Sequence, residues 1–142
     1  MIRVAGLLAI ALIVSGCAPS VDSFSIHRFT VARGQNEFPP LDRTVSDPGA
    51  AARLYERIRG MPPQSARGTV FCAMDWGVRY ELSFFARGER VLHGVMDMGC
   101  HVIDLGAADI RAFDDSFEAE LLGALGLYTR GHELWPTPLP RP

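Results

Sequence analysis

A chain of 142 residues has room for one small domain, and its charge already excludes one class of function. Its 14 basic residues, all arginine, face 16 acidic residues, which gives a formal net charge of −2. This balance supplies no basic surface of the kind that binds a nucleic-acid backbone, so we expect no nucleic-acid partner.

The N-terminus has the pattern of a secretion signal. Arg3 supplies one positive charge, and Val4–Val14 is an unbroken apolar run of 11 residues. A helix needs about 20 residues to cross a bilayer, so this run is too short to span one. It suits the hydrophobic region of a signal peptide, which we expect over residues 1–16.

Small residues and a cysteine follow the apolar run directly. Val14-Ser15-Gly16-Cys17 resembles the lipobox of bacterial lipoproteins. The resemblance implies cleavage before Cys17, a diacylglycerol on its thiol and acylation, often by palmitate, of the new amine. Two or three acyl chains, at about 0.8 kcal/mol per buried CH₂, anchor a protein durably. An ordinary signal peptide with a chance cysteine, or an uncleaved anchor, is the alternative.

The lipobox resemblance also implies a location. The protein would be extracytoplasmic and lipid-anchored to the cell membrane. Because Ala18 rather than aspartate follows the cysteine, the resemblance implies the outer membrane if the source is Gram-negative. Residues 17–46 mix Ser, Gly, Pro and charge, so we expect a lipidated N-terminus and tether there, with room for a short strand over 23–31.

A helix is predicted at the start of the folded domain. Asp47 suits the N-cap and Pro48 the first helical position. Gly60 suits a left-handed C-terminal position, and the prolines after it forbid continuation. The apolar residues between them recur at helical spacing and predict the buried face: Ala51, Leu54, Tyr55 and Ile58.

From residue 68 to 105 the apolar pattern changes to a period of two. Apolar and polar residues alternate most clearly over 78–84, which predicts a half-buried antiparallel strand. Gly88 suits the turn of a hairpin after it. The other predicted strands of a three- or four-stranded meander are 70–72, 91–98 and 101–105.

A second helix and a tail complete the chain. Asp115-Ser116-Phe117-Glu118 resembles a capping box, and Gly126 suits the end of the helix that it begins. Proline occupies every second position from Pro136 to Pro142, so we expect residues 131–142 to form an irregular tail. We therefore expect an α+β domain over 47–130, in which a small meander is flanked by an N-terminal and a C-terminal helix packed on one face.

Two cysteines remain once Cys17 is assigned to lipid. An exported protein lies in a compartment that permits disulfides, so we expect Cys72 to pair with Cys100. The bridge would close a loop of about 28 residues and stabilise the fold by about 3.5 kcal/mol in the chain-entropy model.

The segment around these cysteines resembles small secreted or lipid-anchored bacterial proteins of unknown function. The resemblance rests on the pattern Cys-x-x-Asp-x-Gly-Val-x-Tyr, from Cys72 to Tyr80, and on the later pair Gly99-Cys100, and it covers about Leu54 to Leu127. It implies the domain layout and the Cys72–Cys100 pairing, but no activity.

A soft-ligand cluster suggests one alternative, a copper carrier. Met96, Met98, Cys100 and His101, with His93 nearby, are residue types that bind Cu(I). On a strand, however, the two histidines would lie on the face opposite the sulfur ligands. A bridged cysteine cannot bind metal either. We therefore expect no metal site and no cofactor.

Catalysis and protease inhibition are two further alternatives. The chain has no G-x-S-x-G or H-E-x-x-H motif, and Asp75, Asp97 and Asp104 near strand ends are the residues that a small hydrolase would use. Cys72-Ala73-Met74, with Cys100, resembles the reactive-loop segment of subtilisin-type protease inhibitors. The second disulfide of that inhibitor family is missing, which argues against this alternative. Because no catalytic motif is present either, we assign no catalytic residue.

These observations favour a membrane-anchored binding or envelope-interaction module, with an envelope protein as its partner. The contact candidates are Asp75 and Trp76, because a tryptophan on an exposed turn offers a large contact area. The alternative is a Trp76 side chain that folds back over the edge of the sheet.

Overall fold

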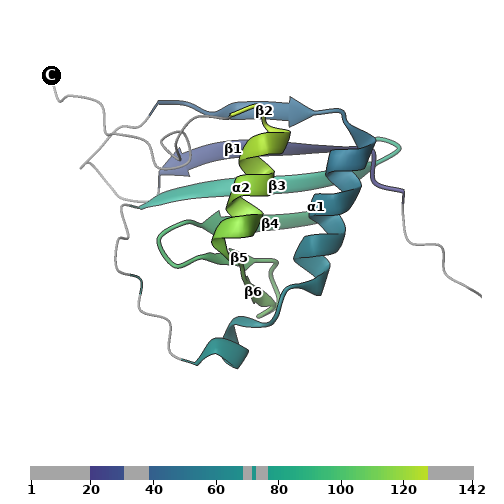
Figure 1. Ribbon diagram of the computed structural model, residues 1–142. Coiled ribbons are helices and arrows are strands. Elements are labelled where there is room, and N and C mark those ends of the chain that lie inside the picture. Colours follow the sequence, from purple (N-terminus) through teal and green to yellow (C-terminus); the bar gives the residue numbers. More distant parts are fainter. Residues whose placement is uncertain (1–19, 31–38, 69–71, 73–76, 128–142) are drawn as a thin grey trace, which may run out of the picture.

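Six antiparallel strands form one sheet in residues 20–30, 39–68, 72 and 77–127, the part of the chain that the computed structural model describes (Figure 1). Their order across the sheet is β2-β1-β3-β4-β5-β6. Their bounds are β1 Ser23–Thr30, β2 Asp42–Val45, β3 Val78–Ala86, β4 Glu89–Asp97, β5 Val102–Asp104 and β6 Ile110–Ala112.

Two helices, α1 (Pro48–Gly60) and α2 (Asp115–Ala124), lie side by side over one face of this sheet (Figure 1). A short 3₁₀ helix, η1 (Gln64–Arg67), follows α1. The α+β class expected from the sequence is confirmed. No helix in the described part of the chain has the length and apolar character needed to span a membrane.

The expectation of three to four strands is wrong. The short strand allowed over 23–31 is present as β1, but it pairs with β3 inside the sheet instead of belonging to a tether. Strand β2 also comes from the segment 17–46, and β6 follows the last strand that the sequence indicated. The β1 signal is weak because Arg28, only 8% exposed, continues the inward row that Phe24 and Ile26 begin. β2 is an edge strand with mostly exposed side chains, and β6 has three residues, so neither carries a hydrophobic period.

The β3–β4 hairpin confirms the clearest strand prediction. Its inward residues, Val78, Tyr80, Leu82 and Phe84, are all buried. Arg87 and Gly88 form the connection with φ values of 54° and 81°, the conformation of a two-residue hairpin turn. The strand expected over 70–72 lies outside the described residues except for Cys72.

Helix α1 begins as predicted but ends differently. The Asp47 carboxylate accepts hydrogen bonds from the N–H groups of Gly49 (2.9 Å) and Ala50 (3.1 Å), so it is the N-cap. The prediction of a left-handed Gly60 is wrong, since Gly60 is the last helical residue. Met61 becomes extended, with ψ of 144°, because the prolines that follow exclude a helical residue before them.

Helix α2 begins one residue earlier than the capping-box pattern indicates. Asp114 is the N-cap, and its Oδ1 accepts a hydrogen bond of 2.9 Å from the Phe117 N–H. Glu118 is therefore one position too late for a capping box. Gly126 follows the helix with φ of 70°, as expected of a C-terminal glycine.

The core lies between the two helices and the covered face of the sheet. Phe84 is fully buried, its ring stacks on Phe24 with centroids 5.6 Å apart, and it meets the edge of Tyr55 from α1 at 5.9 Å. Phe117 and Leu121 contribute the buried face of α2. The packing is tight at Gly94 of β4, where a Cβ would approach Leu105 to 2.8 Å.

Candidate functional site

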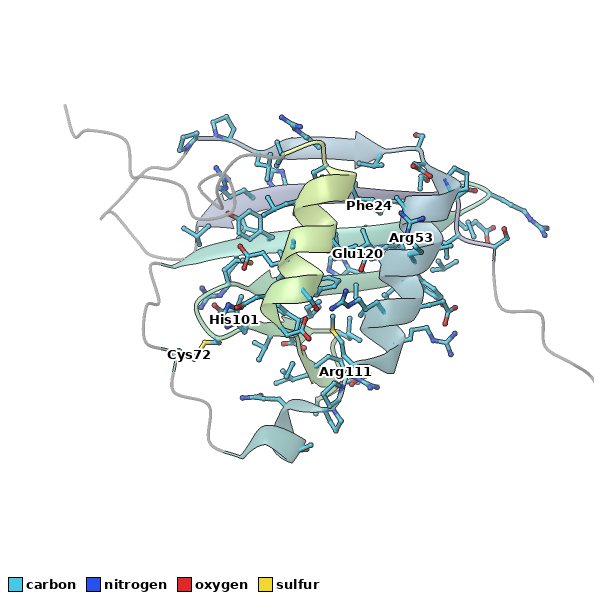
Figure 2. All side chains as sticks on the ribbon, in the orientation of Figure 1. Phe24, Arg53, Cys72, His101, Arg111 and Glu120 are labelled. Carbon is cyan, nitrogen blue, oxygen red and sulfur yellow. A yellow bond between two sulfur atoms is a disulfide. The ribbon has the colours of Figure 1, made fainter. Side chains whose placement is uncertain are left out.

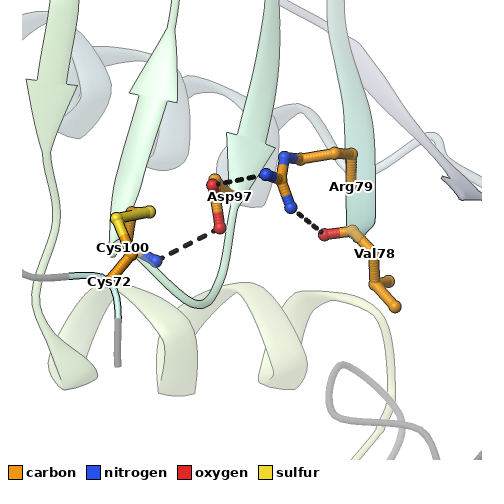
Figure 3. Close-up of a disulfide and its surroundings, with 5 residues drawn as sticks. All are labelled: Cys72, Val78, Arg79, Asp97 and Cys100. Atoms are coloured by element: carbon orange, nitrogen blue, oxygen red, sulfur yellow. Dashed lines mark hydrogen bonds and ion pairs between the residues drawn. A yellow bond between two sulfur atoms is a disulfide. The ribbon is translucent and has the colours of Figure 1, made fainter. Parts of the chain in front are cut away.

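A disulfide joins Cys72 to Cys100, which confirms the predicted pairing (Figure 3). Their Cα atoms are 4.5 Å apart, and the bridge spans 28 positions of sequence. Cys72 belongs to the segment before β3, and Cys100 belongs to the turn between β4 and β5. The bridge therefore ties two segments together at one end of the sheet.

An ion pair supports this turn. Asp97, the last residue of β4, lies opposite Arg79 of β3, with Oδ2 and Nη2 2.9 Å apart (Figure 3). The side chains are only 13% and 17% exposed. The other carboxylate oxygen of Asp97 accepts a hydrogen bond from the Cys100 N–H at 3.2 Å, and Arg79 donates to the Val78 carbonyl at 3.1 Å. Asp97 thus fixes the turn that carries Cys100.

The same turn presents His101 toward α2. His101 has a φ of 52°, and its N–H donates to the Met98 carbonyl at 3.3 Å. Its own carbonyl accepts from the Phe113 N–H at 3.0 Å, and its ring meets the edge of the Phe113 ring at 5.3 Å. The imidazole and the carboxylates of Asp115 and Glu118 bring one ligand atom each within 4.8 Å of one another.

The structure does not bring together the soft-ligand cluster that the sequence suggested. Met96 and Met98 are 0% and 3% exposed and belong to the core. Cys100 is bridged, which leaves no thiolate for Cu(I). His93 lies on the helix-free face of the sheet, next to Ser83 and Glu81.

That helix-free face carries polar pairs. The Nδ1 atom of His93 lies 3.2 Å from Ser83 Oγ and 3.7 Å from Glu81 Oε1, and His27 lies 3.5 Å from Asp42. A catalytic serine, histidine and acid need the acid on one ring nitrogen and the serine on the other. Here both partners face the same nitrogen, and Ser83 is only 6% exposed. The three residues lack the geometry of a proton relay.

The strand-end aspartates that a hydrolase would use have structural partners. Asp97 pairs with Arg79, and Asp104 accepts a hydrogen bond of 2.8 Å from the Gly106 N–H. Asp75 lies outside the described residues. The described aspartates, Asp97 and Asp104, are thus each engaged in a contact that stabilises the local backbone or strand pairing.

A shallow hollow of about 190 Å³ lies between the end of α1, the residues after β6 and the start of α2. The two charged residues that line it, Arg57 and Asp114, form an ion pair of 2.9 Å, and Arg57 also lies 2.8 Å from the Glu120 carboxylate. Figure 2 shows Glu120 facing Arg53 across the two helices. The Ser116 hydroxyl, the Phe117 N–H and then Arg57 hold the pKa of Asp114 below its usual value.

Cys17, Asp75, Trp76 and the tail 131–142 lie outside the described residues. Comparison with known proteins adds no relative: no family model matches the chain, and no curated protein or solved structure is significantly similar to it.

Sequence reasoning missed two features, the Arg79–Asp97 pair and the approach of His101 to α2. A signal for the second was present, because Asp115 and Glu118 are three positions apart and share one side of a helix.

Proposed function

We propose that the protein is an extracytoplasmic lipoprotein, anchored through Cys17, that acts as a non-catalytic binding or interaction module of the cell envelope. The observation that carries this proposal is the Cys72–Cys100 disulfide. Stable disulfides form in oxidising compartments and are rare in the cytosol, so the bridge supports export. It also leaves Cys17 as the remaining member of the three cysteines, at the position that the lipobox requires.

The helix-free face of the sheet is the contact surface that we favour. Among the described elements, both helices lie on the other face (Figure 1). Half-buried apolar residues, Phe29, Phe85 and Val95, alternate there with the polar pairs. Aromatic residues among polar groups are typical of protein–protein contact surfaces. We also propose that Asp75 and Trp76, in the segment that precedes β3, contact the partner.

The proposal of a non-catalytic role rests on how the residues that an enzyme would need are arranged. Ser83, His93 and Glu81 have the wrong mutual geometry for nucleophilic catalysis, and Asp97 is held in an ion pair. The copper-carrier alternative loses support as well, because two of its sulfur ligands are in the core and the third is bridged.

Site-specific photocrosslinking in cells tests the proposal. A photoreactive amino acid at Val95, on the helix-free face, should yield one discrete adduct with an envelope protein. The matched control carries the same group at Glu56, an exposed position on α1. The adduct from Val95 should be lost when Cys17→Ser removes the lipid attachment point. Equal adducts from both positions, or no adduct from Val95, would contradict the proposed surface.

A further inference from the structure

We propose that His101, Asp115 and Glu118 form a binding site for a divalent transition-metal cation, with Zn²⁺ as its representative. The site would offer three protein ligands and leave one position for water. It does not depend on where the protein is anchored. Sequence patterns indicate that Asp115 and Glu118 share one side of a helix, but they do not place His101, which belongs to the turn before β5, beside them.

The spacing of the three side chains suits a single bound ion. Their ligand atoms lie within 4.8 Å of one another. Around tetrahedral zinc, with bonds of about 2.0–2.2 Å, neighbouring ligand atoms are about 3.3 Å apart. The remaining adjustment falls on Asp115, whose exposed side chain can rotate without disturbing the core.

The histidine is already positioned. Its backbone is fixed by the hydrogen bonds to Met98 and Phe113, and its ring contacts the Phe113 ring. The disulfide at Cys100 precedes it directly, and Asp97 holds the same turn. Figure 2 shows His101 beside α2, near the end of the sheet where Cys72 lies. A ligand held in this way loses little conformational entropy when a metal binds.

Charge distribution on α2 supports a cation at this place. Asp114 and Glu120 are paired with arginines of α1: both contact Arg57, and Glu120 also lies 3.6 Å from Arg53. Asp115, by contrast, makes no ion pair within the part of the chain that the structure describes. The N-terminus of α2 contributes about half a positive charge, which is less than the full negative charge of the Asp115 carboxylate alone.

The residue types select the class of metal. Imidazole suits zinc, copper, iron and nickel, whereas Mg²⁺ and Ca²⁺ prefer oxygen ligands alone. One imidazole and two carboxylates, without a thiolate, form a set that binds Zn²⁺ with an open coordination position. Such a site can anchor a partner that supplies the fourth ligand.

Calorimetric titration with Zn²⁺ tests the site. The full chain carries Cys17→Ser in every sample, so that no free thiol competes for the metal. We expect one Zn²⁺ per chain, and we expect His101→Asn to weaken binding by about tenfold or more. Asparagine tolerates the left-handed backbone, so this variant removes the imidazole while keeping the turn. Glu118→Gln should weaken binding similarly and is the second variant if His101→Asn does not fold.

The matched control is His93→Gln, which removes a histidine that also lies beside a glutamate, but on the other face of the sheet. It should bind Zn²⁺ as the parent does. Zn²⁺ should also raise the melting temperature of the parent and of His93→Gln, but not that of folded His101→Asn. Unchanged affinity in His101→Asn, loss of binding in His93→Gln, or a parent that binds no Zn²⁺ would each overturn the proposal.

Discussion

The two faces of the sheet differ in what their side chains do. The covered face is apolar and closed: Phe24, Tyr80, Phe84 and Met96 are all fully buried beneath the helices. The helix-free face alternates half-buried apolar residues with polar pairs such as Glu81 and His93. The first face supplies most of the free energy of folding, because apolar burial is the dominant favourable contribution. The second face contributes less buried apolar surface, and it is the face that we propose as the contact surface.

Adjacent phenylalanines of β3 give the sharpest test of this comparison. Phe84→Ala should lower the free energy of unfolding by about 3–5 kcal/mol, because it leaves a cavity against Phe24 and Tyr55. Phe85→Ala, on the helix-free face, should cost about 1 kcal/mol or less, as most partly exposed positions do. Urea denaturation followed by circular dichroism measures both. Similar losses in the two variants would mean that the second face is also a packed interior.

The disulfide stabilises neither face by packing, since it acts chiefly on the unfolded chain. Replacing both Cys72 and Cys100 by serine should lower the free energy of unfolding by about 3.5 kcal/mol. The control, Cys17→Ser, should leave it unchanged because Cys17 closes no loop. The same urea denaturation measures both variants. If the doubly substituted chain unfolds at the parent's urea concentration, the bridge makes no contribution to stability.

The Arg79–Asp97 pair tests whether charges at the ends of the central strands β3 and β4 are structural. Asp97→Asn should cost about 2 kcal/mol, because both side chains are largely buried and the turn loses a charged acceptor. Glu56→Gln is the comparison, since Glu56 is exposed and 4.0 Å from Arg59. It should cost less than about 0.5 kcal/mol. Equal effects would show that the Arg79–Asp97 pair is no more than a surface contact.

Acid should weaken the start of α2 slightly. The folded pKa of Asp114 is lowered, first by the Ser116 hydroxyl and then by the Phe117 N–H. The ionised carboxylate therefore stabilises the fold above its unfolded pKa, about 3.9, and this contribution is lost as the pH falls through the lower folded value. Asp114→Asn keeps the N-cap but does not titrate. The stability difference between parent and variant, measured by thermal unfolding, should shrink between pH 5 and pH 3; a constant difference would contradict this role.

How much was predictable from sequence varies with the physical signal. Helix α1 and strand β3 carry complete apolar periods, and Asp47 and Gly88 mark their boundaries, so both were predicted. β1 was underestimated because an arginine occupies a buried inward position, which is rare and depends on partners far away in the sequence. The Arg28 Nε atom donates to the Tyr80 hydroxyl at 3.1 Å, across 52 positions.

The candidate site also combines one feature that the sequence predicts with one that it does not. The Cys72–Cys100 pair was predictable because compartment and cysteine count left one pairing. The approach of His101 to Asp115 and Glu118 was not, because it depends on a left-handed residue in a turn and on the exact start of α2. Periodicity reports neither of these.

Export followed by lipid anchoring leaves a covalent record at the N-terminus that mass spectrometry can read. The full chain is produced in a bacterial host, purified in detergent and digested without reduction, and its peptides are weighed by mass spectrometry. We expect an N-terminal peptide that begins at Cys17 and carries diacylglycerol and an amide-linked acyl chain, together with a Cys72–Cys100 cross-linked peptide. A chain that begins elsewhere, or a Cys17 that carries a free thiol and no lipid, would contradict this expectation.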